Sequence, residues 1–250
     1  MKKHKKLRKI ILIVLLVFVV VFFGCFLVLN IYSKTGTYKA VDVDTYLEST
    51  DEAKVTTKNK NIYFEPENKN NIGFIFYPGG LVDKKAYSPI ASSLALKGYY
   101  TVIVNMPYNL AIFGSNNAKG IIKDETDIKQ WYIGGHSLGG AFAAKYYKDN
   151  MSSVSGLVLM ASYSIYDIKD GNVLSIYGSN DKVLSMEKYE KNIVNLPSNF
   201  NEIVIDGGIH SYFGSYGHQK GDGEATISRE QQTTIVVDAI DEFLGGNNVN

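Results

Sequence analysis

The sequence predicts an α/β fold with a mostly parallel sheet and helices on both of its faces, preceded by one transmembrane helix. Three observations lead to this prediction. Short apolar runs alternate with helical segments between residues 53 and 250, which is typical of a parallel sheet. An apolar run of 20 residues occupies positions 10–29, the length of a membrane span. The sequence GGHSLGG (134–140) stands between one of the short apolar runs and a helical segment.

The N-terminal segment has the composition of a signal anchor. Residues 1–9, MKKHKKLRK, carry six lysine or arginine residues and no acidic residue. At 1.5 Å per residue, the run at 10–29 extends about 30 Å and matches the hydrocarbon core of a bilayer. It is too long for a cleaved signal peptide, and no small-x-small cleavage site follows it. Because positive residues stay in the cytoplasm, we expect a cytoplasmic tail (1–9) and an anchor (10–29). A linker (30–52) and one extracytoplasmic domain (53–250) would follow.

Cys25 is the only cysteine of the chain, so no intramolecular disulfide is expected. The preceding residues, FFG, resemble a lipoprotein cleavage box, and lipidation of Cys25 is therefore an alternative. We favour a cysteine packed in a spanning helix, because apolar sequence continues beyond it. Either route attaches the domain to a membrane.

Charge and metal-ligand content argue against nucleic-acid binding and against a metal-dependent activity. The net charge is +1, and removing the six positive charges of the tail leaves −5 on the rest of the chain. This mildly acidic body has no nucleic-acid footprint. With four histidines and one cysteine in all, no ligand cluster is expected, and we predict no metal and no organic cofactor.

The elements of the domain follow from apolar runs bounded by turn residues. Strands are expected at 54–59, 61–65, 72–77, 100–105, 131–133, 155–160, 173–177 and 202–205, the first two as an antiparallel hairpin. Helices are expected at 83–97, within 116–128, and at 138–149, 186–195 and 226–244, the last capped by Thr226 or Ser228. The short connection 162–171 leaves no room for a ligand-covering insert, so we predict an open site.

Ser137 is the predicted nucleophile. It is the centre of Gly135-x-Ser137-x-Gly139, which follows a predicted strand and precedes a predicted helix, as in the nucleophile elbow. The sharp turn strains the backbone of the serine, and neighbouring residues with side chains would clash. This accounts for the glycines.

A serine nucleophile requires a base, and His210 is the favoured candidate. It follows the last strand directly, which places it at the same carboxyl edge of the parallel sheet as Ser137. His218 lies eight residues further on in a loop. His136 is adjacent to Ser137, and its side chain is expected to point away and to pack beside the elbow.

The acid that orients the base is predicted to be Asp181, which follows the strand at 173–177. Asp206, directly after the strand at 202–205, is the alternative. The chain order Ser137, Asp181, His210 is the order of nucleophile, acid and base in one known triad arrangement. For the oxyanion we expect the backbone N–H of Leu138 and a second donor from the turn Pro78-Gly79-Gly80-Leu81. Gly80 is the first choice for that donor and Leu81 the second.

These motifs resemble the α/β-hydrolases, in particular the small lidless dienelactone-hydrolase-like proteins. The resemblance covers about residues 60–245 and rests on PGG (78–80), GHSLG (135–139), GSNDKV (178–183) and GGIH (207–210). The segment from His210 to Gln232 is similar to a membrane-anchored or secreted bacterial subgroup. The resemblance implies the same nucleophile, acid and base. One departure is Pro78, where many relatives have a histidine.

The sequence therefore predicts a membrane-anchored serine hydrolase that cleaves carboxylic esters through an acyl-enzyme. Its substrate would be a small-molecule or envelope-derived acyl compound. A peptidase or acyltransferase with the same triad is one alternative, and a non-catalytic envelope-binding protein is another. Tyr108, Tyr212 and Phe213 are candidates for lining the pocket, with ordinary packing as the alternative for each.

Overall fold

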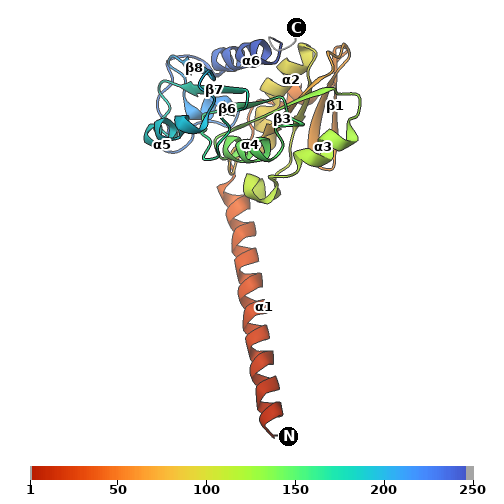
Figure 1. Ribbon diagram of the computed structural model, residues 1–250, viewed down its shortest axis with the longest axis vertical. Coiled ribbons are helices and arrows are strands. Elements are labelled where there is room, and N and C mark those ends of the chain that lie inside the picture. The colour runs from red at the N-terminus through yellow and green to blue at the C-terminus, as the bar shows by residue number, and fades with distance from the viewer. Residues whose placement is uncertain (1, 246–250) are drawn as a thin grey trace. The chain divides into compact units, whose positions relative to one another are not determined.

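A computed structural model describes residues 2–245 of the chain, with side chains for residue 9 and residues 11–245 (Figure 1). The chain divides into two compact units, Met1–Thr37 and Tyr38–Asn250. The first unit contains one helix, and the second contains a sheet with helices on both of its faces.

Helix α1 (Lys2–Gly36) is continuous, and between Ile11 and Val28 it exposes apolar side chains around its circumference. Its segment Ile11–Gly36 is long and apolar enough to cross a membrane. The predicted span 10–29 lies almost entirely within this segment. Cys25 is exposed on the helix and forms no disulfide.

The expected linker 30–52 differs from the structure. Residues up to Gly36 continue α1, and residues from Tyr38 onward belong to the second unit. The backbone of Tyr38 donates to Leu81 O (2.8 Å) and accepts from Asp83 N (2.9 Å). Val43 is buried in the same unit. These contacts join residues far apart in sequence, which is why composition alone suggested a linker.

Eight strands in the described residues form one sheet, in the order β1-β2-β4-β3-β5-β6-β7-β8. Their bounds are β1 (Ala53–Lys58), β2 (Asn61–Pro66), β3 (Ile72–Tyr77), β4 (Tyr100–Ile103), β5 (Gln130–His136), β6 (Gly156–Met160), β7 (Val173–Gly178) and β8 (Asn201–Ile205). β1 pairs antiparallel with β2, and β2 antiparallel with β4; the remaining pairs are parallel. The predicted fold class is confirmed.

The predicted hairpin is present, and its turn is tight. Lys58 pairs with Asn61, and the two residues between them, Asn59 and Lys60, have φ values of 52° and 67°. Two consecutive positive φ values give a turn whose twist matches that of the flanking strands. β5 is longer than the predicted 131–133, because Gly134 and Gly135 continue the pairing with β3. Glycine's low strand propensity hid this extension.

Five helices of the second unit cover the two faces of the sheet. They are α2 (Ser88–Leu96), α3 (Ala118–Asp124), α4 (Leu138–Asp149), α5 (Met186–Asn192) and α6 (Arg229–Gly245). α2 and α6 contribute to one apolar core, and α3 and α4 to the core on the opposite face (Figure 1). α5 joins the face of α4, since Tyr189 bonds Ser175 on that side of β7.

Two helix starts differ from the predicted positions for local reasons. The predicted helix 83–97 begins as a 3₁₀ helix (Lys84–Tyr87), and the α-helix starts only at Ser88-Pro89, where proline favours a first turn. The last helix begins at Arg229 rather than 226. Ser228 Oγ accepts from Gln231 N (3.1 Å), and Gln231 Oε1 accepts from Ser228 N (2.8 Å). This reciprocal capping box selects Ser228 over Thr226 as the cap.

The parallel strands bring distant turns to one edge of the sheet. The turn at 78–81 follows β3, and Ser137 follows β5. Asp181 and His210 lie in the connections that follow β7 and β8. All four connections leave from carboxyl ends, where sites of open α/β sheets collect.

Candidate active site

Ser137 lies on a strained turn that its glycine neighbours make possible. Its φ is 53° and its ψ is −123°, a conformation that L residues rarely adopt. A Cβ on Gly135 would lie 2.6 Å from the carbonyl carbon of Gly139, and one on Gly139 would overlap Tyr77 O. Ser162 Oγ, in the connection after β6, donates to Ser137 O (2.8 Å) and supports the turn. The sequence-based reason for the glycines is confirmed by this geometry.

His210 and Asp181 form a buried pair. His210 Nδ1 lies 2.8 Å from Asp181 Oδ2, and each side chain is 1% exposed. Asp181 Oδ1 accepts from the backbone N–H groups of Val183 and Leu184, at 2.8 Å each. Because a carboxylate only accepts, Nδ1 of His210 carries the proton and Nε2 is left as an acceptor.

The two alternatives to this pair lie elsewhere. Asp206 is exposed, and its Oδ1 accepts from Ser179 Oγ (3.3 Å) rather than from a histidine. His218 is exposed in its loop. The geometry therefore favours Asp181 over Asp206 and His210 over His218.

Ser137 and His210 line one cavity of about 440 Å³. Within residues 2–245, His210 Nε2 is buried and has no hydrogen-bond partner, so no hydrogen bond joins it to Ser137. Such bonds are often long in a free enzyme and shorten when substrate binds.

Three segments form the rest of the cavity wall, and most of their side chains are apolar. The start of α4 contributes Leu138, Ala141 and Phe142; the connection after β6 contributes Ala161, Ser162, Tyr163, Ile165 and Tyr166; the segment after Asp181 contributes Val183, Leu184, Ser185 and Lys188. The β6–β7 connection, which the sequence suggested was too short to cover a ligand, thus forms one side of the cavity. Tyr108, Tyr212 and Phe213 are not among its residues, and Phe213 is fully buried.

The turn after β3 presents one free backbone donor to this region. Leu81 N donates to Asn109 O (2.8 Å), and Gly79 N donates to Tyr87 Oη (2.9 Å). Across the described residues, the N–H groups of Gly80 and Leu138 have no acceptor. A Cβ on Gly80 would lie 3.0 Å from Leu138 Cδ2, so the two segments are adjacent. Gly80, rather than Leu81, is the donor that this geometry leaves available.

Tyr87 takes up a role that the sequence did not reveal. Its hydroxyl accepts from Gly79 N (2.9 Å) and forms a hydrogen bond with Nδ1 of the fully buried His136 (2.9 Å). Burial raises the pKa of Tyr87 above its ordinary value, so the phenol keeps its proton. Burial, and then the charge of His210, lowers the pKa of His136 well below its usual range. Neutral His136 packs against Phe213 as well (ring centroids 5.5 Å), consistent with the expected packing position.

The loop that carries His210 is held by two further residues. Asp222 accepts from the backbone of His210 (3.2 Å), from the backbone and hydroxyl of Ser211 (2.7 and 2.8 Å), and from Gly223 N (2.8 Å). Buried Gln232 on α6 accepts from Ile209 N (3.0 Å) and donates to Ile209 O (2.9 Å). Both residues lie in the segment that resembles the bacterial subgroup, and that resemblance was the only signal for them.

Comparison with known proteins agrees with this architecture. The sequence model of the Alpha/beta hydrolase family matches residues 73–234. No curated protein gives a significant sequence match. Among solved structures, Est1E from Butyrivibrio proteoclasticus aligns with a TM-score of 0.55 at 13% identity, covering 78% of this chain and 100% of its own.

Two further structures are similar to a comparable degree. A dienelactone hydrolase from Anabaena variabilis aligns with a TM-score of 0.56 at 13% identity, covering 77% of this chain and 99% of its own. Thermogutta terrifontis esterase 2, phosphoramylated by tabun, gives 0.55 at 13% identity, with coverages of 80% and 97%. These identities are low, and the likeness is one of fold. With the family match over most of the second unit, the chain belongs to the alpha/beta hydrolase family and is a hydrolase.

Proposed function

We propose that the chain is a serine hydrolase that cleaves carboxylic esters through an acyl-enzyme. The observation that carries the proposal is the buried pair of His210 and Asp181, whose free nitrogen belongs to the same cavity as the strained Ser137. The order of these three residues along the chain and the esterases among the structural neighbours support it further.

In the proposed first step, the hydroxyl of Ser137 attacks the ester carbonyl while His210 Nε2 takes its proton. Asp181 holds the imidazole in the required tautomer and stabilises the cation that forms. The oxyanion accepts hydrogen bonds from the N–H groups of Gly80 and Leu138, whose positions are fixed before the reaction begins.

In the proposed second step, His210 gives its proton to the leaving alcohol, and the ester bond to that alcohol breaks. A water molecule then attacks the acyl-enzyme, with His210 again as base, and releases the carboxylic acid and free Ser137. This cycle needs no group beyond the residues named.

We further propose that α1 is an uncleaved anchor, with residues 1–9 in the cytoplasm and the hydrolase unit outside. The apolar length of Ile11–Gly36 supports a membrane span, and the six basic residues of the tail support the orientation.

The first test is covalent labelling of the full chain in detergent micelles by a fluorophosphonate probe, read out by fluorescence on a gel. We expect the wild type and Ser152→Ala to be labelled and Ser137→Ala to be unlabelled, because Ser137 is the proposed nucleophile and shares the cavity with His210. Ser152 is exposed and lies outside the cavity. Absence of labelling in all three proteins, or labelling that survives Ser137→Ala, contradicts the proposal.

The second test separates the two candidate acids by ester hydrolysis. Asp181→Asn should lower kcat by a factor on the order of 10⁴, as the loss of the orienting carboxylate does in a known triad enzyme. Asp206→Asn, a matched change at an exposed aspartate, should leave kcat within about twofold. The reverse pattern would move the acid role to Asp206.

The third test concerns the loop that positions His210. Burial tends to raise the pKa of Asp222, but its hydrogen bonds from Ser211, Gly223 and His210 outweigh this and lower it. Its carboxylate therefore stabilises the folded state above the unfolded pKa of about 3.9, and this stabilisation is lost as pH falls through the lower folded pKa.

Asp222→Asn places an amide N–H₂ against N–H donors and should lower the free energy of unfolding by about 1–3 kcal/mol at pH 7. The difference from wild type should shrink as the pH falls below about 4. Thermal unfolding from pH 7 to pH 3 measures both effects, with exposed Asp170→Asn as control. Equal melting temperatures for the two variants at pH 7 would exclude the anchoring role.

A further inference from the structure

The wall of the cavity contains one lysine, Lys188, and no acidic side chain. Apolar side chains such as Leu138, Phe142, Ile165 and Val183 form most of the remaining wall. An exposed lysine along an apolar cavity packs its stem on the wall and keeps its ammonium toward water. The cavity therefore offers a ligand an apolar interior with one positive charge at its solvent end.

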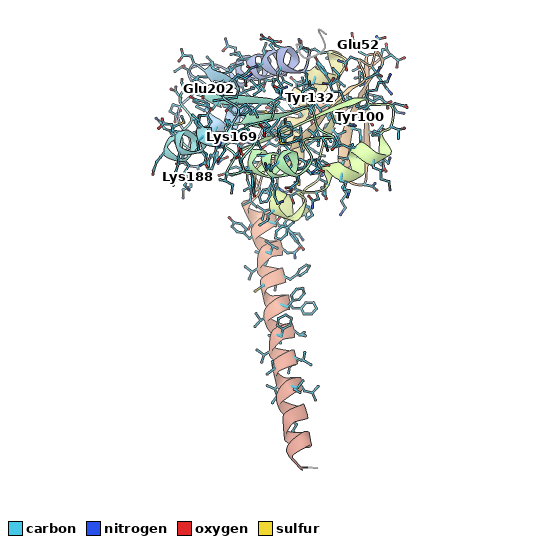
Figure 2. All side chains as sticks on the ribbon, viewed as in Figure 1. Glu52, Tyr100, Tyr132, Lys169, Lys188 and Glu202 are labelled. Carbon is cyan, nitrogen blue, oxygen red and sulfur yellow. The ribbon has the colours of Figure 1, made fainter. Side chains whose placement is uncertain are left out.

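The backbone of Lys188 is fixed relative to the buried pair. Lys188 lies in the first turn of α5 (Figure 2), and its N–H donates to Ser185 Oγ at 3.4 Å. The residues just before Ser185 include Val183 and Leu184, whose N–H groups bind Asp181. One short segment thus sets the place of both the acid and the lysine, which limits the distance between the reacting carbonyl and the ammonium.

Lys188 has no carboxylate partner of its own. Other lysines of the second unit do form ion pairs: Lys69 with Glu65, Lys97 with Asp241 and Lys145 with Asp149. In the part of the chain that the structure describes, no carboxylate oxygen lies within ion-pair distance of Lys188. Its charge is free to meet a ligand.

The charge of the rest of the protein makes this cation significant. Outside the basic tail the chain carries a net charge of −5, so an anionic substrate approaching the domain is repelled on average. A single unpaired ammonium at the cavity provides the local attraction that such a substrate needs, whereas a neutral ester gains nothing from it.

We propose that the substrate is an ester with an anionic group on the part that occupies this cavity, separated from the reacting carbonyl by a short apolar segment, and that Lys188 recognises the anion. This inference rests on the proposed esterase activity. The anion belongs either to the acyl group, as in a half-ester of a dicarboxylic acid, or to the alcohol. Both have the same chemistry at Lys188.

The experiment compares matched charged and neutral esters with the full chain in neutral detergent. For the acyl side, the pair is mono-p-nitrophenyl glutarate and p-nitrophenyl pentanoate. For the alcohol side, the pair is the butyrate esters of 4-(hydroxymethyl)benzoate and of benzyl alcohol. The measured quantity is the ratio of kcat/KM for the charged ester to that for its neutral partner, in wild type, Lys188→Met, Lys188→Glu and Lys191→Met.

We expect Lys188→Met to lower this ratio about 5- to 20-fold in one of the two pairs, because a charge-assisted contact is lost. Lys188→Glu should lower it further. Lys191→Met removes the same charge from the same helix but not from the cavity wall, and should change the ratio by less than about twofold. The wild-type preference should also weaken as salt is added. The pair that responds identifies the side of the ester that carries the anion.

The outcomes separate failure of the proposed Lys188 role from failure of the proposed esterase activity. If Ser137-dependent hydrolysis occurs but Lys188→Met and Lys191→Met give equal ratios in both pairs, the role of Lys188 is wrong and the esterase proposal stands. If no ester is hydrolysed in a manner that depends on Ser137, both proposals fail.

Discussion

The close approach of the first turn of α4 to the end of β3 is the constraint on which the site depends. No Cβ fits on Gly139 beside the carbonyl oxygens of Tyr77 and Pro78, and none fits on Gly135 beside the backbone of α4. This contact accompanies the positive φ of Ser137 at the start of α4, and Gly80 lies beside the side chain of Leu138. The position of the proposed nucleophile and of the proposed oxyanion donors thus depends on this backbone packing.

The two buried histidines beside this turn have different partners. His210 donates from Nδ1 to Asp181, which leaves Nε2 as an acceptor. His136 Nδ1 lies 2.9 Å from the hydroxyl of Tyr87. The rings are 4.4 Å apart between centroids, and a charge on both would be unfavourable. Burial, and then the charge of His210, lower the pKa of His136 well below its usual range, so His136 stays neutral.

Much of this architecture could be predicted from the sequence. The strands, the mostly parallel sheet and the carboxyl-edge placement of Ser137, Asp181 and His210 follow from apolar runs and turn residues, and the glycines of the elbow follow from steric reasoning. The choice of Asp181 over Asp206 came from chain order, and the geometry favours it. These features are local in sequence or are dictated by sheet topology.

The features that the sequence did not reveal depend on contacts between distant segments. Tyr87 supports the turn after β3 from a neighbouring 3₁₀ helix, since its hydroxyl accepts from Gly79 N. Asp222 binds the His210 loop from twelve residues away. Tyr38 joins the hydrolase unit through Leu81. No periodicity or motif records such pairings, and for the same reason the sequence could not decide between pocket lining and ordinary packing for Tyr108, Tyr212 and Phe213.

The account's central claim is that Ser137, His210 and the donors of Gly80 and Leu138 act on one reacting centre. A crystal structure of the protein after reaction with diisopropyl fluorophosphate tests it most directly. The claim predicts phosphorus bonded to Ser137 Oγ, the phosphoryl oxygen within about 3 Å of both N–H groups, and His210 Nε2 within hydrogen-bond range of an oxygen of the adduct. An adduct on another residue, or one on Ser137 whose phosphoryl oxygen points away from Gly80 and Leu138, would contradict it.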